Sequence, residues 1–215
     1  MILANWAQSV LSYGMADTIS LATTAIFLFS GYLLGSISSA IVVSKLFGLA
    51  DPRQIGSGNP GATNVLRYAG KKIAIITLAG DALKGVIPIK ISLMWGVGLE
   101  VATLVGFSAF LGHLFPVFHD FKGGKGVATF LGVTSALYWQ IGAGFIASWV
   151  FVALIFRYSS LSALLSCLIA LALVWKGSQS AIIVSCYLMM VVFIYIKHRE
   201  NITNLIAGKE KKIGN

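Results

Sequence analysis

The chain has 215 residues, of which 57% are hydrophobic and only 11% are charged. A soluble domain has about 25% charged residues, so this composition excludes an ordinary soluble fold and predicts an all-α integral membrane protein. A span needs about 20 apolar residues, which leaves residues 1–215 room for one membrane-embedded domain and nothing else. The formal net charge of +9 is explained by basic residues beside apolar segments, so we expect no nucleic-acid partner.

The N-terminal segment up to Ser20 contains no Lys or Arg, so it lacks the basic region of a signal peptide. We expect it to be retained as an extracytoplasmic leader. The two cysteines, Cys167 and Cys186, lie in apolar segments and lack the spacing of a thiolate metal site. We therefore expect neither a metal site nor a disulfide framework.

Seven apolar segments follow, and each is predicted to be a membrane-spanning helix. In chain order they are Leu21–Phe47, Ile73–Trp95, Val101–Phe118, Val127–Trp139, Ile141–Phe156, Leu161–Trp175 and Ala181–Ile196. The fourth and fifth segments together are about 45 Å long at about 1.5 Å per residue, which is too long for one ordinary span and short for two.

The distribution of positive charge favours two separate spans here. With seven spans, thirteen Lys and Arg residues fall on one side of the membrane and only Lys176 falls on the other. Merging the fourth and fifth segments would change that division to eight against six. Because cytoplasmic loops carry the excess of Lys and Arg, we expect seven helices with an extracytoplasmic N-terminus and a cytoplasmic C-terminus. The longest non-apolar stretch, Gly48–Lys72, is expected to be a cytoplasmic loop.

A glycine-rich cluster, Gly56-Ser57-Gly58-Asn59-Pro60-Gly61-Ala62-Thr63-Asn64, lies in this loop. It matches G-x-G-x-x-G by accident, because no βαβ unit surrounds it. Glycines let backbone N–H groups approach an anion, Ser57, Thr63 and Asn64 add neutral donors, and Arg67 adds a forked cation. The cluster therefore predicts a phosphate site, and the alternative is a tight turn with ordinary capping residues.

A second cluster, Lys122-Gly123-Gly124-Lys125-Gly126, precedes the fourth apolar segment. It lacks the first glycine and the Ser or Thr of a Walker sequence, so ATP binding is not indicated. Glycines at the start of a helix expose N–H donors at its positive end, as anion sites do. We expect Lys125 to contact phosphate and Lys122 to be an interfacial anchor.

Asp81 and Lys84 lie three residues apart in the second segment, on one face of a helix. Charges within a membrane are costly unless they pair or face the bundle interior, so the pair is either functional or a structural contact that fixes helix packing. Gly85 and Pro88 are expected to kink this helix. His113 is expected to be a hydrogen-bond donor in packing.

A third polar cluster, His198-Arg199-Glu200-Asn201, ends the last apolar segment. It predicts either a site residue at His198 or a tail that binds lipid headgroups, together with Lys209, Lys211 and Lys212. Ser159 and Ser160 precede the sixth segment and are expected to cap that helix. A His-x-x-x-x-Asp dyad, which would indicate one kind of acyl-transfer chemistry, is absent from the chain.

At these residues the chain resembles the bacterial acyl-phosphate:glycerol-3-phosphate acyltransferases, the PlsY family. The resemblance rests on the run from Gly56 to Arg67, on Gly123 to Thr129 and on His198 to Ile202, and it covers essentially the whole chain. Asp81-x-x-Lys84-Gly85 and Gly112-His113 also fit. Thr203-Asn204 replaces a more basic pair.

The resemblance implies transfer of an acyl group from acyl phosphate to the 1-hydroxyl of glycerol 3-phosphate, giving lysophosphatidic acid and phosphate. It implies that the reaction needs no cofactor and forms no covalent acyl-enzyme. It also implies that membrane lipids surround the protein and that a phosphate acyltransferase makes its acyl phosphate. It places the chain in the bacterial cytoplasmic (inner) membrane, with the active site facing the cytoplasm.

The resemblance also implies roles for individual residues. Ser57, Lys125 and His198 are expected to be catalytic, with either His198 or a substrate phosphate oxygen as the base. Substrate binding is expected from Gly56, Gly58, Asn59, Gly61, Thr63, Asn64, Arg67, Gly123, Gly124, Gly126, Ser160 and Asn201, and support from Asp81, Lys84 and His113. The alternative from another class is a small organic-anion transporter with Asp81 and Lys84 as its gate.

Overall fold

The computed structural model describes residues 20–214, and the expected extracytoplasmic leader falls almost wholly outside this range. Every regular element in the described residues is a helix. The elements are α2 (Leu21–Gly35), α3 (Ser39–Leu46), α4 (Ala62–Met94), α5 (Leu99–Leu114), the 3₁₀ turn η1 (Val117–His119), α6 (Val127–Leu137), α7 (Trp139–Phe156), α8 (Ser159–Gly177), α9 (Ala181–Lys197) and α10 (Arg199–Ile206).

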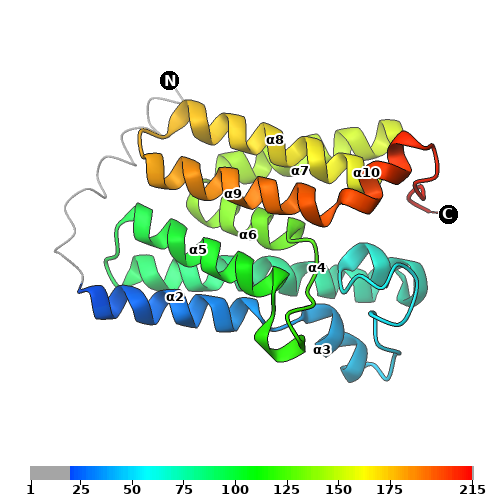
Figure 1. Ribbon diagram of the computed structural model, residues 1–215, viewed down its shortest axis with the longest axis horizontal. Helices are drawn as coiled ribbons and strands as arrows, with labels where there is room; N and C mark the ends of the chain where they lie inside the picture. Colours follow the sequence, from blue (N-terminus) through cyan, green and yellow to red (C-terminus); the bar gives the residue numbers. More distant parts are fainter. Residues whose placement is uncertain (1–19, 215) are drawn as a thin grey trace.

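The longer helices run side by side along the long axis of the molecule (Figure 1). Helix α5 packs against α2, α4, α6 and α9, while α7 and α8 pack together on the far side of α6. The main hydrophobic core lies between these helices and includes the fully buried Phe110, Phe130, Tyr187 and Met190. Short connections thus join antiparallel neighbours, as in other helix bundles.

The seven predicted apolar segments are all helical, but the first is two helices instead of one. Helices α2 and α3 meet at a bend of 46° across Ser36 to Ser38. Ser36 ends α2 and its Oγ donates a hydrogen bond of 2.8 Å to the Tyr32 carbonyl, a contact that favours bending. The break leaves the Ile37 carbonyl outside either helix, where Lys84 Nζ donates to it at 2.9 Å.

The expected loop Gly48–Lys72 is half helical, because α4 already begins at Ala62. Helix α4 is broken at Gly70, where φ is 80° and ψ is 178°, and the expected kink at Gly85 and Pro88 stays a prediction. A positive φ is accessible to glycine without the steric cost that a Cβ imposes. The first two turns of α4 therefore form a separate short segment that carries Arg67.

Three helical segments in the described part of the chain are long and apolar enough to cross a membrane individually, namely Leu99–His119, α7 and α8. Counting the bent pairs α2 with α3 and α9 with α10 as one span each raises this number to five. Helix α6 has 11 residues and is about 16 Å long, about half of the apolar thickness of a bilayer. Seven spans therefore stay a prediction.

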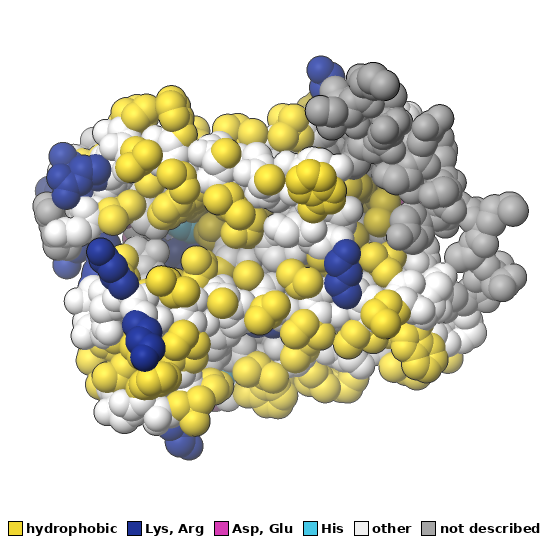
Figure 2. Space-filling view, turned by 180° about the vertical axis from the view of Figure 1, so that it is seen from behind, with side chains coloured by type: hydrophobic (Ala, Val, Ile, Leu, Met, Phe, Trp, Pro, Cys, Tyr) yellow, Lys and Arg dark blue, Asp and Glu magenta, His cyan; other side chains and the backbone are white. Residues whose placement is uncertain are grey.

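The loops predicted to be basic meet at one end of the molecule. The α3–α4 loop, the η1–α6 loop, the α7–α8 connection and α10 all lie at this end (Figure 1). Figure 2 shows most of the visible Lys and Arg side chains gathered at the same end, whereas hydrophobic side chains cover the length of the bundle. We call this the basic end.

Small residues allow two pairs of helices to approach closely. A Cβ at Gly132 on α6 would lie 2.8 Å from the Ala82 carbonyl carbon of α4, and one at Gly35 on α2 would lie 2.7 Å from the Ala109 carbonyl carbon of α5. In a membrane, where apolar side chains gain little by leaving lipid, such contacts are a main source of helix association.

We expect Gly132→Ala to weaken the contact between α4 and α6, because the new methyl group has no room beside the Ala82 backbone. Overpacking of this kind costs about 1–3 kcal/mol. The measurement is the thermal unfolding midpoint of detergent-purified protein. Gly144→Ala on α7 is the matched control, since the nearest atom to its Cβ is Leu173 Cδ1 at 4.0 Å. Equal midpoints for the two variants would contradict the role given to Gly132.

Candidate active site

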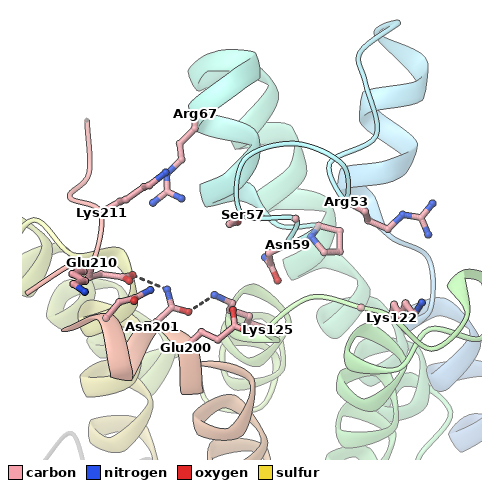
Figure 3. Close-up of a pocket in the computed structure, with 15 residues that line it drawn as sticks. Arg53, Ser57, Asn59, Arg67, Lys122, Lys125, Glu200, Asn201, Glu210 and Lys211 are labelled. Atoms are coloured by element: carbon pink, nitrogen blue, oxygen red, sulfur yellow. Dashed lines mark hydrogen bonds between the residues drawn. The ribbon is translucent and has the colours of Figure 1, made fainter. Parts of the chain in front are cut away.

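A cavity of about 570 Å³ opens at the basic end, between the start of α4, the η1–α6 loop and the C-terminal tail (residues 207–214) (Figure 3). Its lining comes from three stretches of the chain, residues 53–67, 122–125 and 200–211. The lining residues are Arg53, Ser57, Gly58, Asn59, Pro60, Arg67, Lys122, Gly123, Lys125, Glu200, Asn201, Asn204, Lys209, Glu210 and Lys211. Six of these are Lys or Arg and two are Glu, so the cavity carries an excess of positive charge.

The α3–α4 loop (residues 47–61) is held in shape by Asn64, which is buried beneath it. Asn64 Nδ2 donates to the Pro52 and Ile55 carbonyls at 2.9 and 3.0 Å, and its Oδ1 accepts from Ser57 N at 3.0 Å. A buried amide that satisfies three backbone groups fixes the loop from below. Asn64 thus supports the cavity without lining it.

The backbone N–H groups of this loop are largely occupied within the loop itself. Ser57 N is bonded to Asn64, Gly58 N donates to the Ile55 carbonyl at 3.1 Å, and Gly61 N donates to the Asn59 carbonyl at 2.9 Å. Gly58 has a φ of 69°, which its turn requires. These three N–H groups are therefore already bonded within the protein, and anion binding by the rest of the cluster stays a prediction.

The η1–α6 loop (residues 120–126) passes tightly along the end of α5. Gly124 N donates to the His113 carbonyl at 3.2 Å. A Cβ at Gly123 would lie 2.8 Å from the Leu114 carbonyl oxygen, and one at Gly124 would lie 2.8 Å from His113 Cε1. The glycines thus serve close packing, and the loop brings the side chain of Lys125 into the cavity.

Lys125 begins a chain of hydrogen bonds that crosses the cavity (Figure 3). Its Nζ donates to Asn201 Oδ1, and Asn201 Nδ2 donates to Glu210 Oε1 at 2.7 Å. Ser160 Oγ donates to the same Glu210 oxygen at 2.7 Å. Burial lowers the pKa of Lys125, while Glu210 and Glu200 act in the opposite direction. The tail is thereby joined to α8 and α10 through one carboxylate.

His198 lies behind the cavity lining at the junction of α9 and α10. Its side chain is 4% exposed, and Nδ1 donates to the Ile194 carbonyl at 2.8 Å. Burial lowers the pKa of His198 to about 4, so the imidazole is neutral near pH 7. A neutral imidazole with one nitrogen bound to the backbone is a weak base, and its second nitrogen is left as an acceptor.

Asp81, Lys84 and His113 form a buried cluster outside the cavity. Lys84 Nζ lies 3.0 Å from Asp81 Oδ1, and His113 Nδ1 lies 3.7 Å from the same oxygen. The predicted pairing of Asp81 with Lys84 is therefore present. Because Lys84 also binds the Ile37 carbonyl and the His113 carbonyl binds Gly124 N, the cluster ties α2, α4 and α5 to the loop that carries Lys125.

Some of the expected site residues line the cavity, and others do not. Those that line it are Ser57, Gly58, Asn59, Arg67, Gly123, Lys125 and Asn201. Those that do not are Gly56, Gly61, Thr63, Asn64, Gly124, Gly126, Ser160, His198, Asp81, Lys84 and His113. Neither Ser159 nor Ser160 caps α8, whose N-cap is Tyr158. Thr63 Oγ1 instead lies 3.1 Å from Ser159 Oγ.

Sequence reasoning missed several residues of the lining. They are Arg53, Pro60, Lys122, Glu200, Asn204, Lys209, Glu210 and Lys211. Lys122 was expected to be an anchor only, and Lys209 and Lys211 were expected to bind lipid headgroups. The available signal was the concentration of charge after Ile206, but no local pattern indicates that the tail folds back.

The site offers cationic side chains and neutral hydrogen-bond donors. In residues 20–214, no group of three or more His, Cys, Asp or Glu side chains is placed to hold a metal ion. Clustered Lys, Arg, Ser and Asn side chains are suited to phosphate groups. The fold and the site thus define a helical membrane protein with a basic pocket at one end.

Comparison with known proteins is consistent with this class. The family model described as glycerol-3-phosphate acyltransferase matches residues 25–208. The chain is 50% identical to the glycerol-3-phosphate acyltransferase of Methylococcus capsulatus over 85% of its own length and 92% of the relative's. With that of Ralstonia pickettii it shares 49% identity over 89% and 94%. This chain therefore belongs to the glycerol-3-phosphate acyltransferase family.

Solved structures show the same fold. A crystal structure of PlsY (YgiH), an integral membrane glycerol 3-phosphate acyltransferase in its glycerol 3-phosphate form, superposes with a TM-score of 0.85 at 37% identity. It covers 89% of this chain, which covers 96% of that protein. The lysophosphatidic acid form gives a TM-score of 0.83 at 36% identity, with the same coverage. The chain is a multi-pass membrane protein.

We expect Asn64→Ala to loosen the α3–α4 loop, because two carbonyls and one N–H lose their partner. A loss of about 1.4 kcal/mol raises the open population about tenfold. The measurement is the rate of tryptic cleavage after Arg53, located by mass spectrometry. Asn59→Ala is the control, since Asn59 lines the cavity but makes none of these bonds. Equal cleavage rates in the two variants would contradict the role of Asn64.

We expect stability to fall more steeply with decreasing pH in the wild type than in His198→Gln. Between about pH 6.5 and about pH 4 the unfolded histidine binds a proton and the buried one does not, so acid favours unfolding. At about pH 4 this proton binding lowers the free energy of unfolding by on the order of 3 kcal/mol. The measurement is the unfolding midpoint of both proteins from about pH 7.5 to about pH 4.5. Parallel curves would show that His198 titrates normally.

Proposed function

We propose that this protein transfers a fatty acyl group from acyl phosphate to the 1-hydroxyl of glycerol 3-phosphate, giving lysophosphatidic acid and phosphate. The observation that carries the proposal is the cavity at the basic end, with six cationic side chains and neutral donors at the edge of an apolar bundle. Membership of the family supports it, as do the glycerol 3-phosphate and lysophosphatidic acid forms of the homologous structure.

Acyl phosphate is suited to direct transfer because phosphate is a good leaving group. In the proposed step the glycerol oxygen bonds to the acyl carbon, the bond from that carbon to the phosphate oxygen breaks, and the hydroxyl proton passes to the departing phosphate. Positioning and charge neutralisation then supply much of the rate, and no acyl-enzyme forms. The neutral, buried state of His198 supports a substrate oxygen as the base.

The roles of the cavity residues follow from their chemistry. Lys125 and Ser57 are proposed to hold the acyl phosphate, and Arg67 and Asn201 to position glycerol 3-phosphate. Ser160, which was expected to touch substrate, is proposed to act through Glu210, because its hydroxyl is already bonded there.

The proposed setting is a bacterial cytoplasmic membrane crossed seven times, with the N-terminus outside and the basic end in the cytoplasm. The gathering of basic loops at one end supports it. Acyl phosphate has to be made by another enzyme, and a phosphate acyltransferase is the proposed source. The transporter alternative is disfavoured because the cavity lies at one end and the Asp81–Lys84 pair is buried and hydrogen-bonded to a helix break.

The test is phosphate release from palmitoyl phosphate by purified protein, with and without glycerol 3-phosphate, alongside detection of lysophosphatidic acid by mass spectrometry. We expect release to depend on the acceptor and to fall about a hundredfold or more in Lys125→Ala, since a cation at the reacting phosphate is lost. Lys72→Ala is the control, because Lys72 is exposed and lies outside the cavity lining.

Palmitoyl-coenzyme A in place of palmitoyl phosphate tests the donor. Lysophosphatidic acid formed from the coenzyme A ester alone would overturn the proposed donor while leaving acyl transfer intact. A folded preparation without turnover of either donor would overturn the enzyme proposal and favour the transporter.

A further inference from the structure

The C-terminal tail packs against the start of α8, where hydrogen bonds hold it at two points, Glu210 and Ile213. Ile213 N donates to the Arg157 carbonyl at 2.6 Å, and Arg157 Nη2 donates to the Ile213 carbonyl at 3.1 Å. Glu210 accepts from Ser160 and Asn201, as described above. The tail is therefore held as a strap along one side of the cavity.

Consecutive lysines in this strap have different surroundings. Lys211 lines the cavity, whereas Lys212 Nζ lies 5.9 Å from the centre of the Tyr158 ring, outside the lining. The strap thus presents one of the two cations to the cavity.

Lys211 lies opposite Arg67, which comes from the first turns of α4 (Figure 3). Neither side chain forms a hydrogen bond or ion pair with any other residue in the described part of the chain. The nearby carboxylate of Glu210 already accepts two hydrogen bonds at one oxygen. Two cations that lie opposite each other repel, and an anion bound between them offsets that repulsion.

We propose that Lys211 and Arg67 together form a binding subsite for a phosphate monoester, and that the strap exists in part to supply Lys211. The inference rests on the proposed function and adds to it a substrate contact from the tail. Arg67 offers a planar fork and Lys211 a mobile point charge, a combination that holds a dianion from two sides. Both glycerol 3-phosphate and acyl phosphate carry this chemistry.

The kinetic test compares Lys211→Gln with Lys212→Gln, which remove the same charge one residue apart. We expect Lys211→Gln to raise KM about tenfold for the substrate whose phosphate binds there, with Lys211→Arg restoring most of the loss. Lys212→Gln should leave KM within about twofold of the wild type.

The two substrates are varied separately, and the substrate whose KM rises is the one whose phosphate binds at the subsite. A KM unchanged for both in Lys211→Gln would overturn the inference, and so would an equal rise in Lys212→Gln, which would indicate a general field of positive charge. Wild-type turnover is measured in the same assay. Its absence would count against the proposed function, whereas wild-type turnover together with an unchanged KM in Lys211→Gln would count against the subsite alone.

A binding test uses the wild-type chain and needs neither turnover nor a folded variant. The rate of amine modification at Lys211 and Lys212 is measured by mass spectrometry with glycerol 3-phosphate, with palmitoyl phosphate and with neither. We expect one of the two ligands to protect Lys211 about fivefold or more and to leave Lys212 unchanged. Equal protection of both lysines, or of neither, would overturn the inference.

Discussion

The close contact between α4 and α6 is the constraint on which the site depends. Gly132 brings α6 against the backbone at Ala82, and Thr129 Oγ1 donates to the Asp81 carbonyl at 2.9 Å. This register fixes Asp81 within the bundle, where Lys84 neutralises it and His113 lies beside it. Through the His113 carbonyl, the same cluster sets the loop that carries Lys125. A helix contact in the apolar part of the protein thus determines the position of a cation at the basic end.

Hydrogen-bonded polar residues hold the cavity in shape, and two of them, Asn64 and Ser160, are buried. Asn64 occupies the N–H of Ser57 and two carbonyls of its loop, and Ser160 and Asn201 hold Glu210. Buried polar groups that are fully bonded hold loops rigidly, which suits a site that works by positioning. The side chains left free to meet a ligand are those with charge or hydroxyl groups at the cavity surface. The division between supporting and contacting residues is therefore set by hydrogen bonding and not by residue type.

A cavity rich in cations is also consistent with a reaction in which both substrates carry phosphate. Each cation that lacks a partner in the protein gains one when substrate enters, so binding and charge neutralisation occur together. The proposed chemistry does not use His198 as the base, and burial keeps this side chain neutral. The tail contributes one side of the cavity and places Lys211 opposite Arg67.

The sequence by itself determined the all-helical membrane fold, the approximate limits of the seven apolar helices and the shared end of the three polar clusters. These follow from local hydrophobicity and from the side on which Lys and Arg accumulate, which are properties of neighbouring residues. Only the tertiary structure decided the helix breaks at Ser36 to Ser38 and at Gly70. It decided which backbone N–H groups of the α3–α4 loop are hydrogen-bonded within the protein. It also decided that Ser160 binds Glu210, 50 residues away, and that the tail lines the cavity. These features depend on hydrogen bonds between distant segments, and a distant partner leaves no periodic or local signal in the chain.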